Sequence, residues 1–174
     1  MTKYLIDTNI FIESAYRFYA FDICPGFWEF LEKCSESDSI KSISKVYDEI
    51  TPDNPNLQDF KEQLKNRGFF LSIENINPES YAKVSQELQT MQYTQKAISD
   101  FSSGADYFLV ALAYQESYTI VTHEAKSGNN AKNTIKIPNV CEQLEIKCID
   151  VAEFLRSEKA RFVLEETHQR ETKN

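Results

Sequence analysis

Acidic side chains recur in this sequence where a buried strand ends or a helix begins. Asp7 directly follows the apolar run Tyr4–Ile6, and Glu124 comes just after a second β-prone run. Asp106 lies in the first turn of one expected helix, and Glu49 lies inside another. Because ligands of open parallel α/β sheets bind outside the carboxyl ends of the strands, we expect these four carboxylates to converge there.

Four carboxylates in one place would suit a hard divalent cation such as Mg²⁺ or Mn²⁺, which prefers carboxylate oxygens to histidine or cysteine ligands. One or two such ions can supply what phosphodiester hydrolysis requires: an activated water, neutralised phosphoryl oxygens and a stabilised leaving oxygen. Carboxylates packed together also raise one another's pKa unless a cation lies among them. The acids therefore predict a metal-dependent hydrolytic site.

Each acid also has an ordinary structural explanation. Asp7 could simply cap the helix that follows it, Asp106 completes a Ser-x-x-Asp capping pattern, and Glu124 could open a loop. Asp48 and Glu49 are adjacent, so one of the two is expected to be merely solvated. The coincidence of several acids with one geometry favours a shared site over separate structural roles.

Composition sets the frame for this interpretation. The chain has 174 residues, 41% of them hydrophobic, and a formal net charge of −8 from 27 acidic and 19 basic residues. We expect one domain over residues 1–167 and a frayed tail over 168–174. The acidic balance argues against a protein that simply coats nucleic acid phosphates, but it is compatible with a nuclease. No apolar run is long enough to cross a membrane and no export signal is evident, which predicts a cytoplasmic protein.

Cysteine and histidine spacing gives no sign of a zinc site or of a cysteine nucleophile. The four cysteines, at positions 24, 34, 141 and 148, form no Cys-x-x-Cys pair, and the two histidines lie far apart. We expect reduced and mostly buried thiols.

Strand-like and helix-like segments alternate along the chain, which predicts a parallel sheet with crossover helices. Strands are expected at 4–6, 40–43, 69–73, 118–122 and 146–149, and helices from residue 8 and at 27–33, 44–50 (capped by Ser44), 57–66, 78–101 (one helix or two), 103–117, 138–144 and 151–166. The helix at 103–117 is apolar nearly all round and should be central. The polar stretch 126–130 is expected to be a surface loop.

Four blocks of this pattern resemble PIN domains, a family of metal-dependent nucleases that includes the ribonuclease toxins of VapC-type toxin-antitoxin systems. The blocks are Leu5–Asn9, Ser44–Ile50, Ala105–Ala113 and Ile120–Glu124, in the order found in that family. A Cys-Pro-Gly-Phe-Trp stretch at Cys24–Trp28 also resembles a bacterial PIN-like subgroup.

The resemblance implies a PIN-like three-layer α/β sandwich, with a mostly parallel central sheet of four to five strands and helices on both faces. It implies an Mg²⁺- or Mn²⁺-dependent endoribonuclease, a cognate antitoxin protein and a homodimer. The acidic quartet then corresponds to Asp7, Glu49, Asp106 and Glu124 as catalytic residues and metal ligands, with Thr8, Asn9 and Thr122 as supporting polar groups. Glu124 departs from the aspartate that many members carry at the last acidic position.

An acidic nuclease needs a local basic surface for RNA, and four lysines near the expected mouth of the sheet are candidates: Lys45, Lys126, Lys132 and Lys136. Aromatic residues at 16–21 and 27–30 suggest either an apolar patch for a partner protein or part of the core.

Three alternatives remain at this stage. A haloacid-dehalogenase-type phosphatase needs a second aspartate two residues after the first, where this chain has Asn9. A phosphoacceptor receiver domain needs a pair of acids before its phosphorylated aspartate, and Lys136–Pro138 only imitates its late Lys-Pro step. The third alternative is a non-catalytic PIN-like module that binds RNA or a protein, against which the intact set of four acids argues.

Overall fold

The computed structural model of the protein describes residues 2–51, 53–128 and 132–164. The expected tail at 168–174 lies outside the described residues. Within the described ranges, the strands form one five-stranded parallel sheet in the order β3-β2-β1-β4-β5. The strands are β1 Tyr4–Ile6, β2 Ile40–Ile43, β3 Phe70–Leu71, β4 Thr119–Val121 and β5 Cys148–Ile149. The predicted α/β fold with a parallel central sheet is confirmed.

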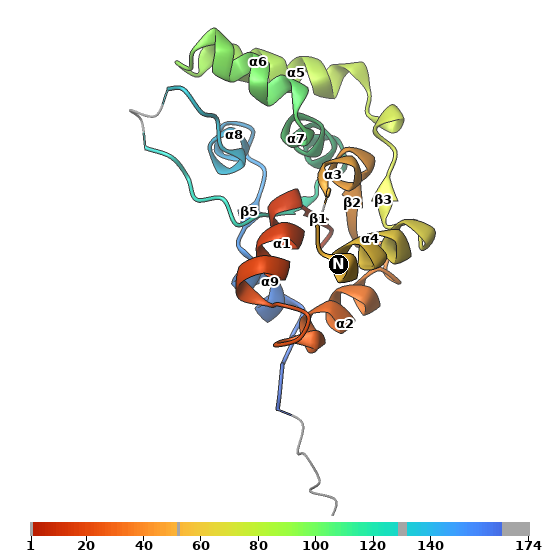
Figure 1. Ribbon diagram of the computed structural model, residues 1–174. Helices are drawn as coiled ribbons and strands as arrows, with labels where there is room; N and C mark the ends of the chain where they lie inside the picture. The colour runs from red at the N-terminus through yellow and green to blue at the C-terminus, as the bar shows by residue number, and fades with distance from the viewer. Residues whose placement is uncertain (1, 52, 129–131, 165–174) are drawn as a thin grey trace, which may run out of the picture.

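Helices lie on both faces of the sheet and form the outer layers of a three-layer sandwich (Figure 1). The α-helices are α1 Thr8–Glu13, α2 Pro25–Cys34, α3 Ser44–Glu49, α4 Pro55–Asn66, α5 Pro78–Thr90, α6 Gln95–Ser103, α7 Ala105–Glu116, α8 Ile137–Gln143 and α9 Val151–Ser157, with a π-helical turn η1 Ser14–Phe18 after α1 and a 3₁₀ turn η2 Ile73–Asn75. In Figure 1, α5 to α8 lie together on one side, and α1, α2 and α9 lie on the other.

Two of these helices begin at an Asn-Pro step, which explains where they start. The side chain of Asn54 accepts hydrogen bonds from backbone N–H groups in the first turn of α4, and Asn77 does the same for α5. The following prolines occupy the first helical position, where no backbone donor is needed. Caps of this kind typically stabilise a helix by about 1 kcal/mol.

The helix α7 is the central element of the core. Residues 109–113 on it are all buried, so α7 is apolar on every side, as its sequence predicts. It packs against β2 and β4 of the sheet and against the neighbouring helices α3, α5, α6 and α8. A helix surrounded in this way keeps its first turn fixed relative to the strand ends.

Several predicted bounds are wrong at helix ends. The central helix begins at Ala105 and not at residue 103, because Gly104 is its N-cap and the Ser103 hydroxyl bonds to the carbonyl of Asp100 instead. Ser44 is the first helical residue of α3 and not its cap.

Three other segments differ from their predicted bounds. Those at 69–73 and 151–166 are shorter in the structure than predicted, and the one at 78–101 is divided into two helices. The strand at 69–73 ends at Leu71, since the Ser72 side chain caps the turn η2. The last helix ends at Ser157. Two residues later, Lys159 adopts a left-handed φ of 57°, and the N–H of Ala160 bonds to the carbonyl of Leu155 and closes the turn.

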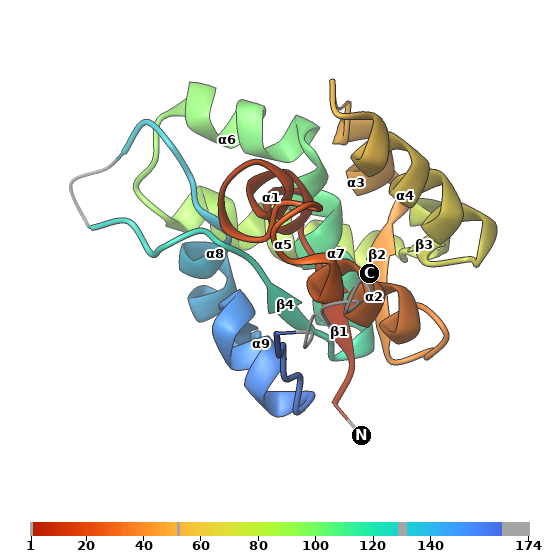
Figure 2. The same ribbon diagram turned by 60° about the horizontal axis from the view of Figure 1, so that its bottom comes forward.

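The strand order reverses between β1 and β4, which lie side by side in the sheet (Figure 2). From β1 the chain proceeds to β2 and β3 on one side, then crosses to β4 on the other side of β1. Ligands of open α/β sheets bind at such a reversal, outside the carboxyl ends of the strands. Asp7 follows β1 at this edge and Thr122 follows β4. No helix among the described residues has the length and apolar character needed to span a membrane.

Candidate metal-binding site at the carboxyl ends of β1 and β4

Asp7 is almost completely buried, with 3% of its surface exposed. One carboxylate oxygen accepts a 2.6 Å hydrogen bond from the backbone N–H of Thr8, so Asp7 does cap α1. The other oxygen accepts a 2.7 Å bond from the Thr122 hydroxyl, at the end of β4. The carboxylate therefore joins the ends of two neighbouring strands in addition to capping a helix.

Asn9 and Thr122 extend this connection. The side-chain amide of Asn9 donates to the Thr122 hydroxyl at 3.1 Å, and its oxygen accepts the backbone N–H of His123 at 2.9 Å. The backbone N–H of Glu124 also donates to the Thr122 hydroxyl at 3.0 Å. The supporting polar residues predicted from the sequence thus hold α1, β4 and the start of the following loop in one arrangement.

Asp106 occupies the first turn of α7, where the helix dipole favours a negative charge. It makes no capping hydrogen bond, so the Ser-x-x-Asp capping interpretation is wrong. Glu49 performs that function from another helix: its Oε1 accepts the backbone N–H of Ala105 at 2.9 Å. Asp106 is thereby left available for a ligand.

Glu49 joins two elements of the site. Its Oε2 accepts a 2.8 Å hydrogen bond from the Thr8 hydroxyl, while its Oε1 caps α7. The end of α3 that carries Glu49 is fixed by Lys61 of α4, which is 7% exposed and donates to the carbonyls of Tyr47 at 3.1 Å and Ile50 at 2.5 Å. Glu49 is therefore placed as a residue that positions α1 and α7 relative to each other.

Glu124 lies at the start of the loop after β4 and is mostly covered. One of its oxygens forms a 2.6 Å ion pair with Lys136, and the other accepts the backbone N–H of Ile137 at 2.8 Å. Glu124 thus connects the two ends of the loop and reaches the first turn of α8.

Three of the four predicted acids line one depression of about 210 Å³: Asp7, Asp106 and Glu124, together with Thr8, Asn9, Ile12 and Glu13. Glu49 is not among its lining residues, so the structure brings three of the predicted carboxylates to the depression and leaves the fourth outside its lining. Glu13, which also lines the depression, was not predicted as a site residue. It could have been found from the sequence, because positions 9 and 13 share one face of α1. The positioning lysine, Lys61, was also missed, although a lysine on the otherwise apolar face of α4 can be read from the sequence.

The carboxylates in the depression are electrostatically unfavourable without a cation. Burial raises the pKa of Asp7 to about 8, and the nearby carboxylate of Asp106 adds to this effect. Burial also raises the pKa of Asp106 to about 7, with further contributions from the carboxylates of Glu124 and Glu49, while the positive charge of Lys136 opposes the rise. Both aspartates therefore tend to hold a proton near neutral pH, because their charged forms are buried beside other carboxylates.

The donor set fits a hard divalent ion in chemistry, with carboxylate, hydroxyl and amide oxygens around one small depression. The residues do not form a closed cage: within the described ranges, no three side chains of His, Cys, Asp or Glu are gathered closely enough to make a complete metal-binding cluster. An open set of this kind suits Mg²⁺, which binds through one or two carboxylates and keeps several waters.

The four candidate lysines are placed differently. Lys136 pairs with Glu124 at the depression, and Lys45 lies over the ring of Phe108 at 5.5 Å from its centroid. Lys126 pairs with Glu142 of α8, and Lys132 donates to the side chain of Gln92 at 3.3 Å. The last two belong to a separate pocket, beside the loop and not in the depression.

The aromatic segments are mostly core. Phe27 and Trp28 are buried, and the rings of Tyr19 and Phe27 stack at 4.3 Å. Tyr16 and Phe18 are more than half exposed. Of the cysteines, positions 34 and 141 are buried and positions 24 and 148 are partly exposed, all as free thiols.

Comparison with known proteins gives one match. No curated protein and no solved structure matches the chain. A family model matches residues 4–162, which include all five strands and every residue of the candidate site. The chain therefore belongs to the family described as Domain of unknown function (DUF4411).

Proposed function

We propose that the protein is a metal-dependent endoribonuclease of the PIN type, which hydrolyses RNA phosphodiester bonds with Mg²⁺ or Mn²⁺. The observation that carries the proposal is the depression at the carboxyl ends of β1 and β4. Asp7, Asp106 and Glu124 line this depression at the reversal of strand order, and two of them have a pKa raised to near or above neutral. A cation would remove this electrostatic cost.

Asp7 and Asp106 are the proposed direct ligands, and Glu124 is proposed to contribute beside them. A bound Mg²⁺ or Mn²⁺ supplies charge neutralisation at the phosphoryl oxygens and lowers the pKa of water. The remaining residues orient this set. Thr122 fixes one oxygen of Asp7, and Glu49 holds the first turn of α7, which carries Asp106.

The biological setting we propose is the toxin half of a type II toxin-antitoxin pair in the cytoplasm, neutralised by a cognate antitoxin and able to form a homodimer. Support comes from the resemblance of the four sequence blocks to VapC-type toxins. Exposed Ile12, Tyr16 and Phe18, on α1 and the turn after it, provide apolar surface next to the depression for such a protein.

A second candidate, a non-catalytic PIN-like module, is favoured by one observation. Asp7, Glu49 and Glu124 each accept protein hydrogen bonds on both carboxylate oxygens, so Asp106 is the one of these four described acids that accepts none. Calorimetric titration with Mg²⁺ separates the two candidates. A module without a metal site gives no heat that depends on Asp7 and Asp106.

The decisive experiment is cleavage of single-stranded RNA by the purified protein. With Mg²⁺ or Mn²⁺ the wild type should cut the RNA internally, and a chelator should stop it. Asp7→Asn should reduce the rate by at least about a hundredfold, since the amide keeps the shape of the side chain but loses the charge that attracts the ion.

The matched control is Asp48→Asn, the same substitution at an exposed acid next to Glu49. Its rate should equal that of the wild type. Cleavage by Asp7→Asn at the wild-type rate would indicate a contaminating nuclease and would favour the non-catalytic module.

A further inference from the structure

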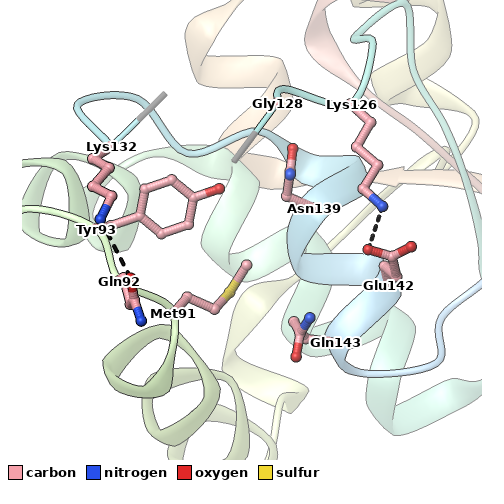
Figure 3. A pocket seen from close by; sticks show the side chains of 9 residues that line it. All are labelled: Met91, Gln92, Tyr93, Lys126, Gly128, Lys132, Asn139, Glu142 and Gln143. Atoms are coloured by element: carbon pink, nitrogen blue, oxygen red, sulfur yellow. Dashed lines mark hydrogen bonds and ion pairs between the residues drawn. The ribbon is translucent and has the colours of Figure 1, made fainter. Parts of the chain in front are cut away.

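A second cavity, of about 360 Å³, lies beside the loop that follows β4 (Figure 3). Three parts of the chain line it: the connection between α5 and α6, the described residues of the loop, and α8. The lining residues are 91–93 in the connection, Lys126, Gly128 and Lys132 in the loop, and Asn139, Glu142 and Gln143 in α8. Its volume falls within the range of pockets that hold small organic ligands, roughly 300–1,000 Å³.

Both described arms of the loop are attached to the walls of this cavity. Asn139 of α8 accepts hydrogen bonds from the backbone N–H of Ser127 at 2.9 Å and from its hydroxyl at 3.0 Å. On the other arm, the carbonyl of Lys132 accepts the backbone N–H of Thr94 at 3.0 Å. The cavity is therefore formed by several fixed elements and is not a gap beside a single free loop.

The lining combines an aromatic face with cations and amides. Tyr93 is partly buried, and Figure 3 shows its ring between Lys132 and Asn139. Lys126, before the centre of the loop, pairs with Glu142 of α8, and Lys132, after it, donates to the side chain of Gln92 at 3.3 Å. Gln92 and Gln143 add exposed side-chain amides. A planar base can stack on a tyrosine ring while amides bond to its edges, and lysines can pair with the attached phosphates.

The same loop connects this cavity to the acidic depression. Glu124 lines the depression at the start of the loop, and its ion pair with Lys136 closes the loop at the other end. The chain segment that begins at the depression therefore continues along the wall of the cavity. Two of the described lining residues are lysines and one, Glu142, is acidic, so the lining carries a net charge of +1 in a chain of −8.

We propose that this cavity, lined by residues 91–93, by Lys126, Gly128 and Lys132 and by α8, binds one unstacked base of single-stranded RNA on the ring of Tyr93, with the two lysines contacting the backbone phosphates. The proposal rests on the proposed function, because it assigns a subsite to that substrate. It specifies that the RNA is recognised as a single strand, since a paired base cannot enter a cavity.

Binding of a short fluorescent oligoribonucleotide, measured by anisotropy in the Asp7→Asn background, tests this subsite without cleavage. Tyr93→Ala should weaken binding on the order of tenfold, whereas Tyr93→Phe should keep the wild-type affinity because stacking needs only the ring. The double variant Lys126→Gln/Lys132→Gln should weaken binding and flatten its salt dependence. The matched control is Tyr114→Ala, an exposed tyrosine of α7 outside this cavity, which should have no effect.

Because Tyr93 packs partly on the core, a second measurement keeps the ring in place. The single native tryptophan, Trp28, is buried, so Tyr93→Trp introduces a reporter in the cavity against a constant background. Titration with the oligoribonucleotide should quench the new fluorescence saturably. A 5′-mononucleotide should quench it only at much higher concentration, and equal affinity for the mononucleotide would overturn the assignment to RNA.

The outcomes separate this proposal from the proposed function. Unchanged RNA affinity in Tyr93→Ala together with unquenched Tyr93→Trp would overturn the base-binding cavity, even if the wild type cleaves RNA. Conversely, RNA binding that depends on Tyr93, without metal-dependent cleavage, would support the base-binding cavity and contradict the proposed nuclease activity.

Discussion

The Thr122 hydroxyl donates a 2.7 Å hydrogen bond to Oδ2 of Asp7, although the two residues lie 115 positions apart in the chain. This bond lowers the pKa of Asp7 against the larger effect of burial. Thr122→Val should therefore raise that pKa further and weaken Mn²⁺ binding by roughly ten- to hundredfold, the usual effect of losing a residue that orients a metal ligand. Thr122→Ser keeps the hydroxyl and should restore most of the affinity in calorimetric titration. Equal weakening in both variants would show that keeping the hydroxyl does not preserve the affinity, and it would contradict the role given to this hydrogen bond.

Divalent metal should raise the melting temperature of the wild type. An ion bound only by the folded state stabilises it by about 2.7 kcal/mol when its concentration is a hundred times the dissociation constant. Asp7→Asn and Asp106→Asn should lose this increment. Without metal both should melt above the wild type, because each removes a carboxyl group whose raised pKa makes the folded state costly near neutral pH. Scanning calorimetry with and without Mn²⁺ measures both effects, with Asp48→Asn as control. A full metal response in the two aspartate variants would refute a shared site.

The metal-free protein should lose stability as the pH rises from about 4 to about 8. The pKa of Asp7 is 3.8 in its ordinary state and about 8 in the folded protein, chiefly because of burial and then Asp106. In that interval the unfolded chain has released the proton and the folded chain still holds it, so a higher pH favours unfolding. Denaturant titrations at several pH values should show that the gap between Asp7→Asn and the wild type widens as the pH rises. A constant gap would contradict the raised pKa.

Glu124→Gln should reduce cleavage less than Asp7→Asn or Asp106→Asn. The charge of Glu124 is already compensated by its ion pair with Lys136, whereas Asp7 has only uncharged donors, the N–H of Thr8 and the Thr122 hydroxyl, so the share of Glu124 in holding a cation is smaller. Single-turnover rates at saturating Mn²⁺ give the comparison. A loss for Glu124→Gln as large as that for Asp7→Asn would make Glu124 a direct ligand of equal weight.

Lys61→Met should destabilise the protein by about 1–3 kcal/mol. The substitution leaves the carbonyls of Tyr47 and Ile50 without their buried donor, and an unsatisfied buried acceptor costs that much. Lys65→Met is the matched control, because Lys65 is an exposed lysine on the same helix, with its bond to the Tyr47 hydroxyl at the surface. Denaturant midpoints measure the difference. Equal midpoints for the two variants would show that Lys61 does not hold the end of α3.

The sheet and the acids that face it could be predicted from the sequence. The hydrogen bonds that join these acids to neighbouring elements could not. Asp7 and Asp106 could be placed because each follows a strong local signal, a buried β-prone run or the start of an apolar helix. The role of Glu49 could not be predicted in this way, since it depends on α3 reaching the first turn of α7, 56 positions along the chain. Helix ends were missed for a similar reason: side chains such as Ser72 compete locally for backbone groups, and the pattern of apolar residues does not register them.

The crossing of the chain from β3 to β4 determines when the candidate site can exist. Asp7 is synthesised well before Thr122 and Glu124, which complete its surroundings only after β4 has joined β1. During translation, a nascent chain that has not yet reached residue 124 therefore carries an aspartate without the strand end that orients it. A protein that degrades RNA would, with this strand order, stay inactive toward its own messenger until β4 had left the ribosome.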